Sequence, residues 1–215
     1  VKQVRNWANI CVEALNHALR GIPREKIRYH TCYSINMGPR LHDMEGKDIL
    51  DIVLKVNAGS YSFEAANPRH EHEWKLWETL KLPEGAVIIP GVISHSTNLI
   101  EHEELVAERL VRFAKVVGRE NVMAGADCGF ASFSTSCEVH PSVVWAKLAA
   151  LVDSLRAALE KSPLNGELAE ELIFRSALLG ILDQCSLERH RMHPIQHRER
   201  SDPHRRHHGL RRDGL

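Results

Sequence analysis

The sequence predicts an α/β fold built of parallel β/α units, and two observations support this. Short apolar runs alternate with longer segments whose apolar residues recur at helical spacing, and turn residues separate the two kinds of segment. Hydrophobic residues make up 43% of the chain and charged residues 26%, as in an ordinary globular protein. Strands that alternate with helices in this way form a parallel sheet with right-handed crossovers and helices on both faces.

The chain opens with a helix, and four strand and helix pairs follow. Apolar positions at helical spacing predict a helix over residues 3–20, which Gly21 and Pro23 end. Four short apolar runs predict strands at 26–32, 59–66, 86–93 and 121–128. Amphipathic spacing predicts the alternating helices at 47–57, 72–81, 103–118 and 140–161.

The charges balance over the whole chain but not along it. Lys plus Arg and Asp plus Glu both number 28, so net charge gives no sign of nucleic-acid or membrane affinity. Residues 186–215 carry eight Arg against four acids and six His, with almost no apolar content. We expect this tail to be disordered and its metal or nucleic-acid contacts to be nonspecific. We interpret 161–185 as a helical extension.

Cysteine usage favours a reducing compartment. The five cysteines are odd in number and widely spaced, and there is neither a signal peptide nor an apolar run of the roughly 20 residues that a membrane helix needs. We therefore expect a cytoplasmic protein without a membrane partner. Three of the cysteines, Cys11, Cys137 and Cys185, fit no ligand pattern.

Four residues with metal-binding side chains fall at predicted strand ends. His30 and Cys32 close the first strand, Glu64 the second and Cys128 the fourth. Because parallel strands end on one rim, these side chains can meet there. Alone, each would be weak evidence, since a free cysteine mostly packs as a small apolar residue. Together, two thiolates, an imidazole and a carboxylate are a zinc set, and their wide spacing argues against a structural zinc finger.

Five motifs, in chain order, carry a resemblance to a known family: "YHTC", "SFEAANPRHEHEW", "IPGVISHSTNLIEHEELVAERL", "ENVMAGADCG" and "HPSVVWAKL". Over roughly residues 1–155 they resemble the carboxyl-terminal half of the cobalamin-independent methionine synthase family, and above all its shorter relatives, which include epoxyalkane:coenzyme M transferase. The resemblance implies a TIM (β/α)8 barrel, of which residues 1–160 hold the carboxyl-terminal half. Since four strands cannot close an eight-stranded barrel, we expect a fragment of a larger protein or an oligomer.

The resemblance also implies a function. It makes His30, Cys32 and Cys128 zinc ligands, with Glu64 as a fourth, displaceable ligand, and it implies that the zinc activates a small-molecule thiol for transfer of a methyl or other alkyl group. A folate-type compound or an epoxide would be the alkyl donor. This ligand set carries a charge of about minus one, which favours thiolate alkylation over hydrolysis. The alternatives are thiol addition to an epoxide and a catalytically inactive zinc-binding fragment.

Two further residues are candidates for catalysis. His95, after the third strand, resembles a family histidine that could shuttle a proton to the leaving group, and it could equally be a loop histidine that bonds to backbone. Asp127 could orient the metal ligands, bind a substrate amine, or be a hydrogen-bonded carboxylate at a strand end. We interpret His70 and His72 as a polar helix entrance and predict packing roles for Trp74 and Trp77.

Overall fold

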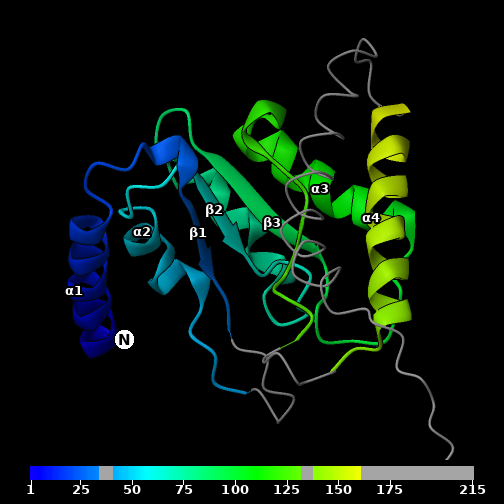
Figure 1. Cartoon of the computed structure of the whole chain (residues 1–215), viewed down its shortest axis with the longest axis horizontal. Coiled ribbons are helices and arrows are strands. Elements are labelled where there is room, and N and C mark those ends of the chain that lie inside the picture. Colours follow the sequence, from blue (N-terminus) through cyan, green and yellow to red (C-terminus); the bar gives the residue numbers. More distant parts are fainter. Residues whose placement is uncertain (34–40, 132–137, 161–215) are drawn as a thin grey trace, which may run out of the picture.

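A four-stranded parallel sheet forms the centre of the molecule (Figure 1). The computed structural model describes residues 1–33, 41–131 and 138–160. The strands lie in the order in which they occur in the chain, β1 (Arg28–Thr31), β2 (Ser60–Phe63), β3 (Val87–Ile93) and β4 (Gly125–Ala126). The predicted α/β fold with four parallel strands is confirmed. The predicted extension 161–185 and tail 186–215 lie outside the described residues, as do Cys137 and Cys185.

Helices flank the sheet on both sides (Figure 1). The α-helices are α1 (Lys2–Ala18), α2 (Leu50–Val53), α3 (Glu103–Val117) and α4 (Pro141–Glu160). Short 3₁₀ helices connect them, namely η1 (Arg24–Lys26), η2 (Gly46–Asp48), η3 (Glu71–Glu78) and η4 (Arg119–Asn121). One apolar cluster joins α3 and α4 to β3, and a second joins α1 and α2 to β2. Burial of apolar area between these layers is the main stabilising term of the fold.

Strand β3 is the most buried element, and its side chains are covered on both faces. Six of its seven residues are buried, which agrees with the continuous apolar run "VIIPGVI". Val92 and Ile93 belong to the apolar cluster with α3 and α4, and Ile88 belongs to a cluster with Phe63, Trp77 and Phe113 of α3. Strands β2 and β4 pair with it on either side.

The strands predicted over 26–32 and 59–66 are each four residues long in the structure, and three further elements differ more. The helix predicted over 47–57 is the 3₁₀ turn η2 followed by the single α turn of α2, and the strand predicted over 121–128 is reduced to the two residues of β4. The helix predicted over 72–81 is the 3₁₀ helix η3. In each case tertiary contacts outweigh the local apolar spacing on which the prediction rested.

The tertiary contacts of η3 explain its 3₁₀ geometry. Residues three apart share one face of a 3₁₀ helix, so Trp74 and Trp77 both reach the apolar cluster around Phe63. Trp77 stacks on Phe63, with 5.1 Å between the ring centroids. At the start of η3, both carboxylate oxygens of Glu71 accept hydrogen bonds from the guanidinium of Arg109 on α3. The packing role predicted for the two tryptophans is confirmed.

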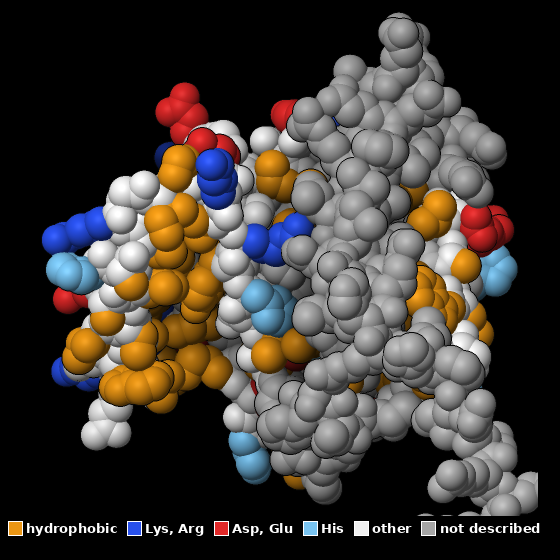
Figure 2. Space-filling model, in the orientation of Figure 1, with side chains coloured by type: hydrophobic (Ala, Val, Ile, Leu, Met, Phe, Trp, Pro, Cys, Tyr) orange, Lys and Arg blue, Asp and Glu red, His pale blue; other side chains and the backbone are white. Residues whose placement is uncertain are grey.

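Helix α1 is apolar on two faces. Its inner face packs through Val12 and its neighbours against the α2 cluster, whereas Val4, Trp7 and Ile10 remain exposed. Trp7 keeps 69% of its surface accessible. Figure 2 shows hydrophobic side chains gathered on the left of the view, over the region of α1. In the described part of the chain, no helix is long and apolar enough to cross a membrane.

Candidate metal centre

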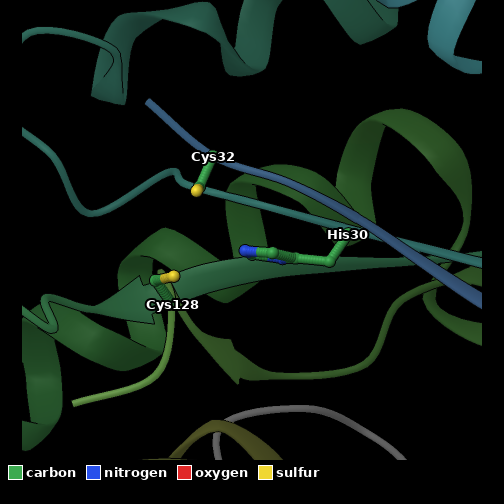
Figure 3. Close-up of side chains that lie close together, drawn as sticks. All are labelled: His30, Cys32 and Cys128. Carbon is green, nitrogen blue, oxygen red and sulfur yellow. The ribbon is translucent and has the colours of Figure 1, made fainter. Parts of the chain in front are cut away.

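Three side chains from opposite edges of the sheet converge at its carboxyl end. His30 lies in β1, Cys32 follows β1, and Cys128 follows β4. Their ligand atoms all lie within 4.8 Å of one another. Figure 3 shows the three side chains turned toward a common space. Two sulfurs and one imidazole at this spacing fit a tetrahedral site for a borderline-soft cation such as zinc, with one position left for a further ligand.

The sheet must curve strongly to bring these ligands together. In a flat sheet, β1 and β4 would be about 14 Å apart, since neighbouring strands are separated by roughly 4.8 Å. The ligand atoms from these two outer strands lie much closer than that. The carboxyl ends of β1 and β4 therefore turn toward each other, as twisted sheets do when they begin to close.

The surroundings set the protonation of the ligands. Burial raises the pKa of the Cys128 thiol to about 11, and the neighbouring Cys32 and Glu64 raise it further. Desolvation lowers the pKa of His30, although Glu64 opposes this. Without a cation, Cys128 is therefore a thiol and His30 a neutral imidazole. A bound cation would reverse the preference of the thiol, because its charge favours the thiolate.

A hydrogen bond orients the His30 ring. Its Nδ1 lies 3.2 Å from the Ser62 hydroxyl on β2. The two residues are direct partners in the parallel pairing of β1 and β2. A second-sphere bond of this kind fixes the ring of a ligating histidine and leaves the other nitrogen for the metal.

Glu64 lies beside the three-residue cluster but is not a member of it. The residue is buried, and its carboxylate has partners of its own. Oε1 accepts the backbone N–H of Tyr33 at 2.7 Å, and Oε2 accepts the Asn67 side-chain amide at 2.9 Å. Its negative charge still raises the pKa of both His30 and Cys128. The structure thus brings three of the four predicted ligands together and keeps the fourth close by.

His95 is buried in the loop that follows β3, with only 1% of its surface exposed. Polar contacts on both sides of it hold this loop. Glu101 accepts the Ser94 backbone N–H at 2.7 Å and pairs with the buried Lys147 of α4 at 2.8 Å. Lys147 also donates to the backbone carbonyl of Leu99. His95 is therefore positioned by a fixed loop rather than by a mobile one.

Asp127 is fully buried directly before Cys128. Its Oδ1 accepts the backbone N–H groups of Ala65 and Ala66, both at 2.8 Å. Its Oδ2 is buried and has no hydrogen-bond partner among the described residues. Burial raises the pKa of this carboxyl to about 7, against the opposing effect of the two N–H donors.

A polar cluster that the sequence did not predict lies next to the centre. His70 directly precedes η3, as predicted for a polar helix entrance. Only 4% of its surface is exposed. Its ring stacks on Tyr33 with 3.6 Å between centroids, and its nitrogens lie 3.4 Å from Asp43 and 3.1 Å from Glu73. The acids in the motif "HDMEGKD" and in "RHEHEW" were the available signal. His72, the other predicted entrance residue, is exposed.

Comparison with known proteins identifies a structural neighbour. The structure of a B12-independent methionine synthase from Shewanella sp. W3-18-1, in complex with selenomethionine, superposes with a TM-score of 0.53 at 21% sequence identity. The match covers 70% of this chain and 43% of that chain, so the present chain spans less than half of its neighbour. Neither a protein-family model nor a curated protein matches. At this identity the likeness shows a shared fold.

Proposed function

We propose that this chain carries the zinc centre of an enzyme that transfers a methyl or other alkyl group to the thiol of a small substrate, as in methionine synthases. The convergence of His30, Cys32 and Cys128 at the carboxyl end of the sheet carries the proposal. A pair of thiolates with one imidazole and an open position is typical of a catalytic zinc rather than of a closed structural site. The similar fold of the methionine synthase supports the same assignment.

The ligands determine the kind of chemistry. Zinc held by them would lower the pKa of a substrate thiol and leave its sulfur nucleophilic. Two thiolates supply negative charge, so a bound water would be activated less than in a site of neutral ligands. Both cysteines must stay reduced to act as ligands, which is why we propose a reducing compartment such as the cytoplasm.

Glu64 fits the role of a displaceable ligand. Its two oxygens already have a resting arrangement with Tyr33 and Asn67, so the carboxylate loses little when a substrate sulfur takes its place. Its charge acts on His30 and Cys128 from the position that it occupies. We therefore assign Glu64 to the fourth position in the absence of substrate.

We assign proton delivery to His95. In the proposed reaction the substrate sulfur forms a bond to the alkyl carbon, and the bond between that carbon and the donor's nitrogen or oxygen breaks. The bonding electrons remain on the donor atom, which takes a proton. His95 is at the carboxyl end of β3, on the same rim as the ligands, and its loop is held by the pair of Glu101 and Lys147.

The curvature of the four-stranded sheet also supports a proposal for the architecture. We infer that the curved sheet is half of a TIM (β/α)8 barrel, because its end strands bend toward each other and its structural neighbour is more than twice as long as the matched region. The remaining walls of the site would then come from outside the described residues.

Zinc content and zinc coordination test the function. The purified chain should hold about one zinc per molecule, and Cys32→Ser should lose it because a hydroxyl is a poor zinc ligand. Cys11→Ser, at an exposed position of α1, is the matched control and should keep the metal. When homocysteine or coenzyme M is added, X-ray absorption at the zinc edge should show one additional sulfur in place of an oxygen.

Two results would contradict the proposal. Equal zinc content in the Cys32→Ser and Cys11→Ser proteins would remove the assigned ligands. Zinc that is held by these ligands but keeps the same sulfur coordination at saturating thiol would indicate a structural metal or an inactive fragment.

A further inference from the structure

We propose that Asp127 is a positioning residue that clamps the two halves of the metal centre together. Gly91, which has no side chain, leaves the space that this contact needs. The Asp127 clamp consists of Asp127, the backbone N–H groups of Ala65 and Ala66, and Gly91 between them. The inference rests on the zinc centre proposed above, and it assigns to Asp127 a role in geometry rather than in proton transfer or substrate binding.

The clamp joins strands that are not neighbours. Ala65 and Ala66 follow β2, and Asp127 follows β4, while β3 lies between these strands. Two hydrogen bonds of 2.8 Å from both alanine N–H groups to one carboxylate oxygen cross over β3. Strands β2 and β4 do not pair with each other, and only their separate pairing with β3 links their backbones. The side-chain hydrogen bonds of Asp127 add a direct link between them.

Gly91 makes the crossing possible. A Cβ atom at this position of β3 would lie 2.1 Å from Oδ1 of Asp127 and 2.4 Å from its Cα. Both distances are far shorter than carbon and oxygen atoms tolerate, and one of them involves backbone, which cannot rotate away. Any side chain at position 91 would therefore push Asp127 off the two N–H groups.

The clamp holds the ligands through their neighbours in the chain. Cys128 follows Asp127 directly, and Glu64 precedes Ala65 directly. On the far side of β2, His30 pairs with Ser62 and so moves with that strand. Fixing β2 to β4 thus fixes the imidazole of the first strand and the thiol after the last strand at one separation.

The hydrogen bonds of the clamp require an acceptor oxygen but no charge. An asparagine at 127 can offer its amide oxygen to both N–H groups, whereas an alanine leaves two buried N–H groups without a partner. A proton donor or a partner for a substrate ammonium would be lost equally in both variants. This difference between asparagine and alanine separates a positioning role from a catalytic one.

The test compares metal binding in the purified full chain. Asp127→Ala should weaken zinc affinity by about 10- to 100-fold in competition with a chromophoric chelator, and it should change the visible absorption bands of the cobalt-substituted protein. Asp127→Asn should stay within about threefold of the unaltered chain, with its cobalt spectrum retained. Gly91→Ala should resemble Asp127→Ala. Gly125→Ala, in which the new Cβ meets the Ile89 side chain instead, is the matched control.

The two Asp127 variants test the clamp by themselves, even if Gly91→Ala fails to fold. Wild-type affinity and spectrum in Asp127→Ala, or equal losses in Asp127→Ala and Asp127→Asn, would overturn the clamp. If Cys32→Ser also kept its zinc, the zinc centre itself would be wrong. If Cys32→Ser lost its zinc while Asp127→Ala kept wild-type binding, only the clamp would be wrong.

Discussion

A buried carboxyl group makes folding depend on pH. Asp127 is 0% exposed, and burial raises its pKa from 3.8 to about 7. A carboxyl whose pKa is higher in the folded than in the unfolded chain binds its proton more tightly when folded. Its contribution to stability is therefore fully present below about pH 4 and is lost as the pH rises through 7.

Asp127→Asn should abolish this dependence, because an amide has no proton to lose in this range. Between pH 5 and pH 8, the free energy of unfolding of the metal-free chain should fall more steeply for the unaltered protein than for the variant. Urea unfolding in the presence of a chelator measures the free energy of unfolding of both proteins at each pH. Since all other groups titrate alike in the two proteins, parallel curves would show that Asp127 is ionised throughout.

That His30, Cys32 and Cys128 lie close together could be predicted from sequence, whereas their surroundings could not. Histidine and cysteine are common metal ligands, and His30, Cys32 and Cys128 all fall at the ends of apolar runs that predict strands. Residue type and position in the predicted strands were enough to group them. The burial of His70 depends on Tyr33, which lies far away in the sequence, and nothing in the pattern around position 70 indicates that stacking partner. The hydrogen bonds of Asp127 depend on the curvature of the sheet, which local patterns do not specify.

A buried ion pair joins helix α4 to the loop that carries His95. Lys147 is fully buried, and its ammonium lies 2.8 Å from Glu101, whose side chain is 9% exposed. Breaking a buried pair by removing one partner leaves an uncompensated charge. The cost is about 3–5 kcal/mol.

Lys147→Met should therefore lower the free energy of unfolding by about 3–5 kcal/mol, as measured by urea denaturation. The double change with Glu101→Gln should recover part of this loss, because the orphaned carboxylate is then removed. Lys115→Met on α3, at an exposed position, is the control and should stay within about 0.5 kcal/mol. A single variant as stable as the control would show that the pair contributes nothing to the fold.

Element length explains which helices were predicted well. Helices α1, α3 and α4 begin and end within two residues of their predicted bounds, because many turns of consistent spacing outweigh any single contact. The short elements η3 and α2 depart from prediction. Over one or two turns, the hydrogen bonds that reach Glu71 from α3 and the packing of Trp77 outweigh local preference.

The whole molecule exposes apolar surface beside the outer strand of its sheet. Strand β1 has a pairing partner on one side only among the described strands, and the nearby helix α1 exposes Val4, Trp7 and Ile10. Proteins rarely leave a sheet edge and an apolar stripe uncovered together. This surface is therefore expected to be covered, by another copy or by further chain.

The isolated chain should consequently associate or aggregate, and sedimentation velocity should show species larger than a monomer. Changing Trp7→Glu and Ile10→Lys together should reduce association, since it places charges in the apolar stripe. Leu99→Glu, at another exposed apolar position, is the control and should leave association unchanged. A well-folded monomer with full turnover in the proposed alkyl transfer would contradict the proposed half-barrel.

The Asp127 clamp also constrains the order in which the molecule can form. Its hydrogen bonds join positions 61 and 62 residues apart, and Cys128 is the last of the three clustered residues to be synthesised. Contacts across such long loops form only after the intervening segments are in place, since the entropy of loop closure opposes them until then. We therefore expect the centre to complete late in folding, and a metal bound there would act mainly by slowing unfolding rather than by guiding the chain to its fold.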